Sequence, residues 1–438
     1  MKTNSEIPDG QPQQAPGVSP HDPYVAFRYR DCRLLLAGGV LANTGRLMQS
    51  VAVGWELYER TGQPMALGWV GLVQGLPIIL LSLPAGHVAD RFDRKKVVAV
   101  TQLVMVLASL GLAALSYYQG SVPLIYGCLL LGAIALAFNW SASAALLPQT
   151  VPLESFSNAV TWRSSGYQVA SVVGPALSGF MIAAFHGATL VYVVDALLGL
   201  LFAVFVAMIA GKQAVRMAEE VTLRTLMAGF HFVWETKIIL ATITLDLFAV
   251  LFGGATALLP IYAKDILNVG PTGLGWMRAA PAIGAFVTAL AFTHLPPSRS
   301  IGRTLLWAVI GFGAATVVFG ISHWFWLSLL MLALTGAFDN ISVVVRHSLV
   351  QLRTSDAMRG RVSAVNNVFI SASNELGAFE SGAVADLSGR MFPSAGAGFG
   401  AIFSVVSGGI GTIIVVLLTA KIWPEIRRLK SLNEIKTE

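Results

Sequence analysis

The sequence predicts an all-α membrane protein with twelve transmembrane helices, arranged as two pseudo-symmetric six-helix bundles. Three observations predict it: a low charge content, a series of long apolar runs, and an uneven placement of Lys and Arg. Only 12% of the 438 residues are charged and 55% are hydrophobic, whereas soluble domains carry roughly 25% charged residues. So few charged side chains could not cover a water-exposed surface of this size. We therefore expect most of the outer surface to face lipid, and a soluble protein is excluded.

Apolar runs long enough to cross about 30 Å of hydrocarbon recur along the whole chain. The expected spans are residues 33–57, 66–88, 97–118, 122–147, 159–185, 189–210, 238–263, 272–294, 301–320, 324–351, 363–388 and 395–421. Several contain a proline, for example Pro77, Pro84 and Pro281. Spanning helices tolerate such breaks when neighbouring helices satisfy the freed backbone groups.

Lys and Arg are concentrated in alternate loops. Residues 91–96, 299–303 and 353–361 form basic loops, whereas the opposite loops hold few basic residues, such as Lys264. Positive residues favour the cytoplasmic side of a membrane. We therefore expect a multi-pass protein of the inner (plasma) membrane with both termini in the cytoplasm. This placement also explains the formal net charge of +6 without a nucleic-acid partner.

The pattern divides the chain into five regions. They are a disordered cytoplasmic N-terminal tail (1–30), an N-terminal six-helix bundle (31–210), a central cytoplasmic linker (211–237), a C-terminal six-helix bundle (238–421) and a cytoplasmic C-terminal tail (422–438). The tail at the N-terminus is polar and Pro-rich and lacks the apolar segment of a signal peptide. Within the linker, residues 223–234 have the pattern of an interfacial amphipathic helix.

The two halves share short segments at matching positions. Leu67-Gly68-Trp69 opens the second span and Leu274-Gly275-Trp276 opens the eighth. Likewise, Gly174-Pro175 with Ser178-Gly179 in the fifth span corresponds to Gly377-Ala378 with Ser381-Gly382 in the eleventh. Because six helices return the chain to the same side, the two copies are expected to be parallel and related by an axis along the membrane normal.

The loop between the second and third spans reads Gly-His-Val-Ala-Asp-Arg-Phe-Asp-Arg-Lys-Lys, residues 86–96. Gly86 permits the close approach of a neighbouring helix. The Asp90 carboxylate can cap the positive N-terminus of a helix from the other half, such as span eleven, and Arg91 and Arg94 can pair with carboxylates or carbonyl groups. Such contacts would form when the cytoplasmic side closes and break when it opens, which makes a conformational latch. The alternative is a basic loop that only sets the topology.

This loop resembles the G-x-x-x-D-R-x-G-R-[KR]-[KR] signature of the major facilitator superfamily, with Asp93 in place of the second glycine. The resemblance extends over residues 25–420 and is greatest to the exporter branch that contains the enterobactin exporter and the transmembrane secretion effectors. It implies the major facilitator fold, in which spans one, four, seven and ten line a central cavity. Span four carries Asn139 and no arginine, unlike a typical proton-linked drug exporter of this superfamily.

The fifth span contains Gly174 and Pro175 in a run of small residues. Small residues permit tight helix packing, and proline bends a helix because it removes one backbone hydrogen bond. The run is similar to the Gly-Pro motif of antiporter-type members, with Ala170 and Ser178 where glycines are usual. That resemblance implies export, and a generic kinked helix is the alternative.

Charged residues inside the spans are candidates for the transport pathway. Each costs about 3 kcal/mol or more in the membrane, so each should face a partner or a wet cavity. Arg46, Asp246, Asp339 and Arg346 lie in the spans that the resemblance places around the cavity. We expect them to form a charge-exchange network in which Asp339 or Asp246 takes up the proton. A static buried ion pair that fixes helix packing is the alternative.

Span eleven carries a polar stripe of Asn367, Ser371 and Asn374, with Glu375 adjacent. Spacings of four and three residues place the stripe on one helix face. This face is either a substrate-binding surface or a hydrogen-bonded seam between the halves. Two further charged residues lie in expected spans, namely Asp195 and Arg278.

The sequence contains no enzyme or cofactor motif. It has no Gly-x-x-x-x-Gly-Lys-[Ser/Thr] loop for ATP and no His-Glu-x-x-His, and its two cysteines, Cys32 and Cys128, make no metal set. We therefore expect no catalytic residues, no metal and no cofactor. The predicted function is a monomeric secondary active transporter that exports a small amphipathic molecule, such as a siderophore, drug or metabolite. Its partners would be this substrate, protons and the lipid bilayer. The alternatives are an importer or facilitator on the same fold and a non-transporting receptor or scaffold.

Overall fold

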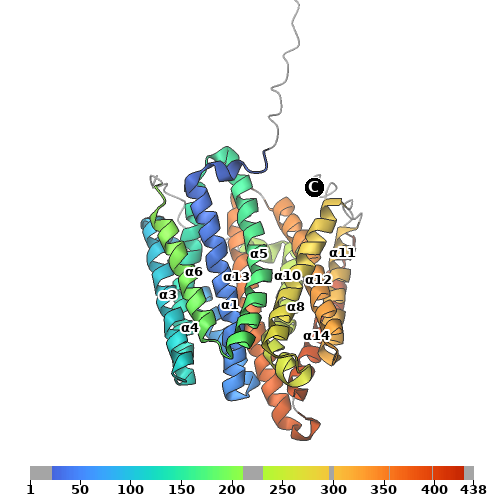
Figure 1. The fold of residues 1–438 in the computed structure, drawn as a ribbon. Helices are drawn as coiled ribbons and strands as arrows, with labels where there is room; N and C mark the ends of the chain where they lie inside the picture. Colours follow the sequence, from blue (N-terminus) through green and yellow to red (C-terminus); the bar gives the residue numbers. More distant parts are fainter. Residues whose placement is uncertain (1–21, 211–229, 295–299, 355, 397, 429–438) are drawn as a thin grey trace, which may run out of the picture.

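Long helices run side by side through the whole molecule in the computed structural model (Figure 1). The structure describes residues 22–210, 230–294, 300–354, 356–396 and 398–428. The N-terminal half contains α1 (Arg30–Thr61), α2 (Pro64–Arg91), α3 (Arg94–Tyr117), α4 (Val122–Leu146), α5 (Leu153–Phe185) and α6 (Thr189–Ala207). The C-terminal half contains α8 (Lys237–Phe252), α9 (Leu259–Ile261), α10 (Gly270–His294), α11 (Ile301–Ile321), α12 (Phe325–Arg353), α13 (Asp356–Met391) and α14 (Phe399–Ile422). Short elements complete the fold: η1 (Val25–Arg28), η2 (Leu147–Gln149), η3 (Gly254–Leu258), η4 (Tyr262–Ile266), η5 (Pro393–Ala395) and α15 (Glu425–Arg428).

Ten helical segments in the described chain are long and apolar enough to cross a membrane. Two more helices, α1 with 32 residues and α13 with 36, exceed the length that a span requires. Both are more polar than the ten because charged residues, including Arg46 and Glu375, lie within them. The structure confirms the predicted all-α membrane fold and is consistent with twelve crossings.

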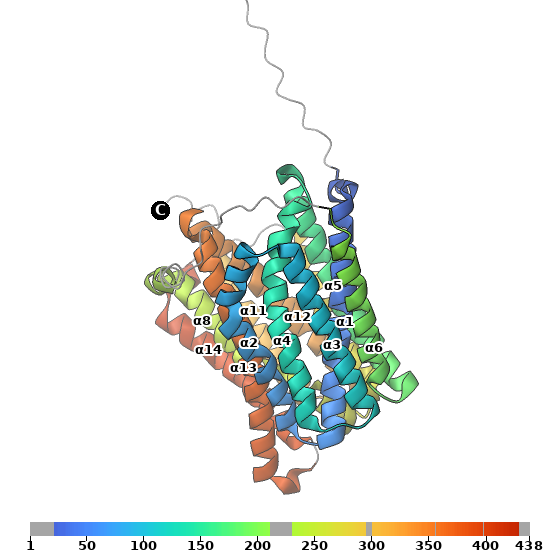
Figure 2. The ribbon, with the colours of Figure 1, turned by 90° about the vertical axis from the view of Figure 1, so that its left-hand side faces the viewer.

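Each half packs mainly within itself. In the N-terminal half, α1 lies against α5 and α6, and α3 lies against α4 and α6. In the C-terminal half, α11 packs on α12 and α14, and α13 packs on α8 and α14. The halves meet through two equivalent helix pairs, α2 with α13 (Figure 2) and α5 with α10 (Figure 1).

The repeated small-residue segments lie at these two contacts. A Cβ placed on Gly275 of α10 would lie 3.1 Å from the Cα of Gly179 in α5, and one placed on Gly382 of α13 would lie 2.6 Å from the Cα of Gly68 in α2. Both helix pairs can approach this closely only because glycine has no side chain. The internal repeat that the sequence predicts therefore corresponds to two matching contacts between the halves.

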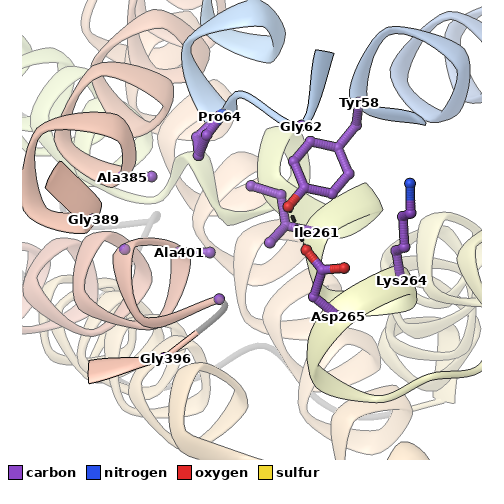
Figure 3. Close-up of a pocket in the computed structure, with 12 residues that line it drawn as sticks. Tyr58, Gly62, Pro64, Ile261, Lys264, Asp265, Ala385, Gly389, Gly396 and Ala401 are labelled. Atoms are coloured by element: carbon purple, nitrogen blue, oxygen red, sulfur yellow. Dashed lines mark hydrogen bonds between the residues drawn. The ribbon is translucent and has the colours of Figure 1, made fainter. Parts of the chain in front are cut away.

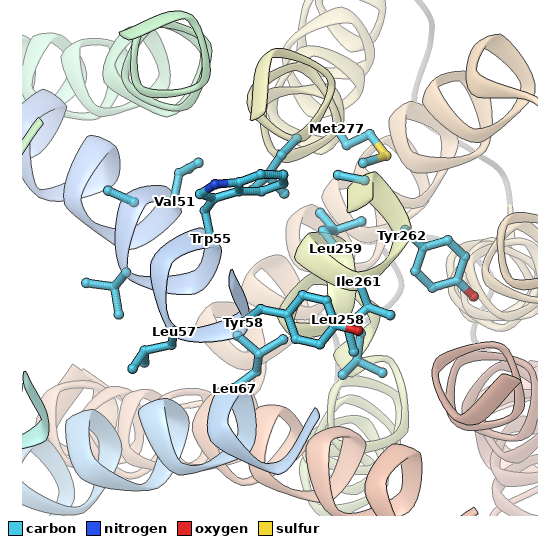
Figure 4. Packing of buried hydrophobic residues seen from close by; sticks show 14 of the residues in the cluster. Val51, Trp55, Leu57, Tyr58, Leu67, Leu258, Leu259, Ile261, Tyr262 and Met277 are labelled. Carbon is cyan, nitrogen blue, oxygen red and sulfur yellow. The ribbon is translucent and has the colours of Figure 1, made fainter. Parts of the chain in front are cut away.

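Hydrophobic packing differs between the two ends of the bundle. We call the end at which α1 begins and α14 ends the termini end, drawn uppermost in Figure 1, and the opposite end the distal end. One large cluster at the distal end includes buried residues of both halves, such as Trp55 and Tyr58 of α1 with Leu259 of α9 (Figure 4). Among the described residues, the clusters toward the termini end each stay within one half. The halves are thus joined by a shared core at the distal end.

The described parts of the expected tails and linker contain short helices. Residues 25–28 form η1, in which Ala26 is buried and its backbone N–H donates to Asn158 Oδ1 of α5 (3.1 Å). The end of the region that we expected to be a disordered tail is therefore folded against α5. Residues 1–21, 211–229 and 429–438 lie outside the described chain, so the amphipathic helix expected at 223–234 is described only at its last few residues, which are helical.

Candidate functional site

A buried ion pair links α8 and α12 inside the C-terminal half. The Arg346 guanidinium contacts the Asp246 carboxylate, and the two side chains are only 3% and 9% exposed. The sequence predicted that Arg346 would lie within a charge network, because an unpaired cation at this depth is costly. About 75 residues of sequence separate the two helices that form this pair. No local sequence pattern can predict a contact between residues so far apart.

Asp339 lies two turns before Arg346 on α12 and belongs to the same group. It lines a small cavity, of about 10 Å³, together with Asp246, Phe338 and Ser342. That volume is near the lower limit for one water molecule. The charges of Asp246 and Arg346 both act on Asp339. Two carboxylates therefore act on one guanidinium, and the neighbouring His347 also acts on Asp246. A proton on either acid or on His347 would balance the charge of this cluster.

Arg46 does not join this cluster, and the predicted four-residue network is wrong in this respect. Arg46 of α1 acts on Asp195 of α6 and on Glu375 of α13. The Asp195 carboxylate accepts a hydrogen bond from Ser109 Oγ at 2.6 Å, and a Cβ on Gly45 would lie 2.5 Å from Asp195 Oδ1. The absence of a side chain at Gly45 is what allows α6 to bring this carboxylate against α1.

Glu375 lies where α13 crosses α2. A Cβ added to Gly75 of α2 would lie 2.2 Å from the Glu375 Cβ, so this glycine makes room for the glutamate. Arg46 and Arg278 both act on the Glu375 carboxylate. Yet no ion pair within 4.0 Å joins Glu375 to either arginine among the described side chains. The charges of α1 and α10 therefore act on the Glu375 carboxylate of α13 without forming an ion pair with it.

Arg278 of α10 is a charged residue whose role the sequence does not indicate. Its Nε atom is buried and has no hydrogen-bond partner. A buried guanidinium donor without an acceptor costs about 1–3 kcal/mol or more, so such a group needs a physical explanation. Its position in span eight was visible in the sequence, but only the fold shows that its charge and that of Arg46 act on the same carboxylate, Glu375.

The residues in and around the polar stripe of α13 face two neighbouring helices, α2 and α8. Glu375 and Ala378 face α2, and Gly377 contacts α8 through the Leu251 carbonyl. Asn374 points between these two directions and is exposed, with its Nδ2 donating to the Ile370 carbonyl of its own helix at 2.9 Å. Ser371 is half-buried, whereas the side chain of Asn367 lies outside the described part. Asn374 thus faces the space between α2 and α8, and its amide makes no hydrogen bond to α2.

Arg94 of the loop for which we expected a latch contacts groups of its own half. The Arg94 guanidinium lies 3.6 Å from the Asp90 carboxylate and donates to the carbonyls of Ala89 (3.1 Å) and Ala145 (3.0 Å). Arg91 is exposed. The close helix approach that we expected at Gly86 is not observed, because a Cβ there would meet no atom within 4 Å. The side chains of the first turn of α13 lie largely outside the described part, so the cap by Asp90 stays a prediction.

Asp93, which replaces the second glycine of the loop signature, has a local structural role. Its carboxylate accepts a hydrogen bond from the backbone N–H of Lys96 at 3.1 Å and caps the N-terminus of α3. Aspartate is among the best N-cap residues and also favours the positive end of a helix. Arg94 then begins α3 in the orientation from which it reaches the Ala145 carbonyl of α4.

The Gly174-Pro175 segment packs α5 between α1 and α10. A Cβ on Gly174 would lie 2.9 Å from the Thr44 carbonyl oxygen, and the Pro175 carbonyl oxygen would lie 2.6 Å from a Cβ on Gly275. Ser178 Oγ donates to the Met48 carbonyl at 2.8 Å. The tight packing that we expected of these small residues is confirmed. Their role in gating stays a prediction.

Sequence reasoning missed a contact that joins the halves at the distal end. The Tyr58 hydroxyl of α1 donates a hydrogen bond to Asp265 Oδ2 of the π-helix η4, beside a hollow of about 380 Å³ (Figure 3). The Lys264 ammonium lies 5.7 Å from the centre of the Tyr58 ring, within range of a cation–π interaction. No local signal marks this contact, because its members lie in different halves of the sequence.

A second missed group is buried in the N-terminal half. Glu56, only 6% exposed, accepts hydrogen bonds from the Tyr192 hydroxyl (2.7 Å) and from the Arg60 guanidinium. Arg60 also donates to the Gly120 carbonyl at 2.8 Å. All these partners lie in one half, so the group holds α1, α6 and the turn before α4 together. Within the described residues, no cluster of three His, Cys, Asp or Glu side chains could hold a metal ion.

Comparisons with known proteins agree with this architecture. A family model described as transmembrane secretion effector matches residues 21–414. The multidrug efflux pump Tap of Mycolicibacterium fortuitum is 25% identical over 367 residues, 81% of this chain and 89% of the pump. The enterobactin exporter EntS of Escherichia coli O81 (strain ED1a) is 24% identical over 382 residues, 87% of this chain and 88% of the exporter. A bacterial homologue of the human lysosomal transporter Spinster, solved in an inward-facing and occupied conformation, shares the fold with a TM-score of 0.69 at 14% identity, over 93% of this chain and 98% of that one.

Proposed function

Because the chain belongs to the transmembrane secretion effector family of the major facilitator superfamily, we propose that it exports a small amphipathic molecule across the inner membrane of the cell. The relatives and the solved structure named above are transporters or transporter homologues. Both relatives named above are exporters, one of drugs and one of a siderophore. We extend export to this chain, with a siderophore, drug or other metabolite as the substrate.

One observation carries the proposal that export proceeds by alternating access. The shared hydrophobic core closes the distal end, while the clusters toward the termini end stay within single halves among the described residues. Each half can therefore move as a body, and the α2–α13 and α5–α10 contacts are where they pivot. With both termini in the cytoplasm, this arrangement corresponds to the state that loads substrate from the cytoplasm.

The Asp246, Asp339 and Arg346 cluster supports proton coupling. When both carboxyl groups are ionised, one guanidinium faces two negative charges, and a proton on either acid restores the balance. A change in protonation thus alters the electrostatic energy between α8 and α12. A helix pair whose energy depends on a proton can bias the equilibrium between two conformations.

The test is efflux from proteoliposomes with an imposed pH gradient. Ethidium, representing drug substrates, and a catecholate siderophore are loaded separately, and their movement is followed in both gradient directions. We expect the gradient to accelerate transport by the unaltered chain, and Asp339→Asn to abolish this dependence. Asp386→Asn is the matched control, because Asp386 pairs with the exposed Arg390 of its own helix at 2.7 Å and lies outside the Asp246, Asp339 and Arg346 cluster. Movement that is independent of the gradient in the unaltered chain would favour a facilitator, and inward accumulation would favour an importer.

A further inference from the structure

The small cavity beside the Asp246–Arg346 pair is lined by oxygen-bearing side chains from two helices. Asp246 comes from α8, and Asp339 and Ser342 come from α12. We propose that this cavity binds a monovalent alkali cation of the size of Na⁺ or Li⁺, in competition with protons. An effect of this ion on transport rests on the proposed function, whereas the binding of the ion does not.

The spacing of residues on α12 brings the oxygen atoms to one place. Asp339 and Ser342 are three residues apart, so they lie on one face of the helix. Asp246 lines the cavity from α8, whereas the lining residues of α11, Val309 and Phe312, are apolar. A cation in the cavity therefore faces two carboxylates and one hydroxyl group. Oxygen atoms of this kind are the ligands that hard cations prefer.

The Ser342 hydroxyl supplies an independent observation. Ser342 is only 5% exposed and lines the cavity, yet its hydroxyl has no hydrogen-bond partner among the described residues. Buried hydroxyl groups normally have a partner. Two others on the same helix do, because Thr335 donates to the Leu332 carbonyl at 2.7 Å and Ser348 donates to the Val344 carbonyl at 2.9 Å. The free Ser342 oxygen therefore indicates an occupant of the cavity.

The charge of the cluster favours a monovalent cation over a water molecule. Asp246 and Asp339 together face one guanidinium, so one negative charge is left when both acids are ionised. His347 also acts on Asp246, but imidazole groups are mostly neutral at about pH 8. Arg346 contacts Asp246 without lining the cavity. One monovalent ion therefore balances the cluster, whereas a divalent ion would leave it positively charged.

The size of the cavity selects a small ion. Its volume is about 10 Å³, near the lower limit for one water molecule. Na⁺ and Li⁺ are smaller than a water molecule, whereas K⁺ is similar to one in size, so K⁺ should bind more weakly. Asp339 is exposed, so an ion can reach the cavity past its carboxylate.

The test measures ²²Na⁺ binding to the full chain in nanodiscs, without substrate and without a gradient. At about pH 8 we expect saturable binding that unlabelled Li⁺ displaces well and K⁺ displaces poorly. Binding should weaken at about pH 5.5, because protons then compete for Asp246 and Asp339. His347→Gln should keep this competition. Loss of the competition in His347→Gln would refute its assignment to the two acids.

Variants assign the binding to the cavity. Asp339→Asn removes a charged ligand and should weaken binding at least about tenfold. Ser342→Ala removes a neutral ligand and should weaken binding about three- to tenfold. Ser348→Ala is the matched control, because the Ser348 hydroxyl is already bonded within its own helix. If the unaltered chain shows no saturable binding, or if both Asp339→Asn and Ser342→Ala bind normally, the inference is overturned.

The outcome is separate from that of the export proposal. Sodium binding to a chain that performs no efflux would uphold the site and reject export. Conversely, efflux driven by a pH gradient in a chain that binds no ²²Na⁺ would uphold export and reject the cation site. Gel filtration of each variant shows whether the fold is retained. Ser342→Ala breaks no hydrogen bond among the described residues, so it keeps the test decisive where Asp339→Asn does not fold.

Discussion

Gly179 of α5 and Gly275 of α10 meet so closely that neither position has room for a side chain. A Cβ on Gly275 would lie 2.6 Å from the Pro175 carbonyl oxygen, and a Cβ on Gly179 would lie 2.4 Å from the Pro271 carbonyl oxygen. Both obstacles are backbone atoms, which cannot rotate away. This pair and its counterpart, Gly68 with Gly382, hold the two halves together in the distal part of the molecule.

Gly275→Ala should therefore destabilise the contact between the halves. Forcing one methyl group into a packed interface typically costs about 1–3 kcal/mol, and the helical gain from Gly to Ala recovers at most about 1 kcal/mol. We expect a lower thermal unfolding temperature in detergent and reduced efflux. The control is Gly127→Ala in α4, where a Cβ meets nothing within 4 Å. Equal stability of the two variants would contradict the close contact.

The sequence predicted the small residues on both sides of this contact, though not that the two helices would meet, because both sides carry a repeated pattern. The Leu-Gly-Trp segments at 67–69 and 274–276 could be aligned without a structure, and so could the Gly-Pro run at 174–175. Small residues within an apolar helix have few explanations other than close packing. Helix positions were predictable for the same reason, because a membrane fixes both the length and the polarity of each span.

Partners across the halves were not predictable from one sequence. Arg46 was expected beside Asp246, but it lies with Asp195 and Glu375, and this depends on how α1 rotates about its axis. Helical spacing fixes which residues share one face, and it does not fix which helix that face meets. The Tyr58 contact with Asp265 was missed for the same reason.

Gly86→Ala tests the latch. In the present conformation its Cβ would meet no atom within 4 Å, so stability should be unchanged or raised by up to about 1 kcal/mol through helix propensity. If α2 closes on a neighbour at Gly86 in the other conformation, efflux should fall although the unfolding temperature does not. Gly75→Ala provides the contrast, since its Cβ would lie 2.2 Å from that of Glu375 and should lower stability. Normal efflux by Gly86→Ala would exclude Gly86 from the latch.

Variants of the Asp246–Arg346 pair can distinguish a structural role of this ion pair from a role in transport. Asp246→Asn removes the carboxylate that contacts Arg346 and leaves Asp339 as the remaining counter-charge. We therefore expect a loss of stability that is smaller than the cost of about 3–5 kcal/mol for breaking an isolated buried pair. Asp246→Leu combined with Arg346→Met should recover most of that stability, because apolar replacements of buried pairs are often neutral. Unfolding temperature and pH-driven efflux are measured on the unaltered chain, on Asp246→Asn and on the double variant. If the double variant regains both, the pair is structural; if it regains stability alone, the pair takes part in transport.

Tyr58 and Asp265 offer the sharpest test of the closed distal end. Their hydrogen bond joins α1 to η4 across the halves, and a hydrogen bond to a charged group contributes about 1.5–3 kcal/mol. Tyr58→Phe should therefore shift the population toward a distally open state by about tenfold or more, since 1.4 kcal/mol corresponds to a factor of ten. Spin labels at Gln63 and Thr272, both exposed near the distal end on opposite halves, would report longer distances.

A double-mutant cycle assigns this shift to the contact itself. If the hydrogen bond is responsible, Asp265→Ala should open the distal end as Tyr58→Phe does, and the two changes together should add little to either alone. Tyr117→Phe is the matched control, because Tyr117 is exposed and contacts only its neighbour Tyr118 among the described aromatic rings. Strictly additive effects of Tyr58→Phe and Asp265→Ala would mean that each residue acts through other neighbours. For Tyr58 one such neighbour is Lys264, whose ammonium lies 5.7 Å from the centre of the ring.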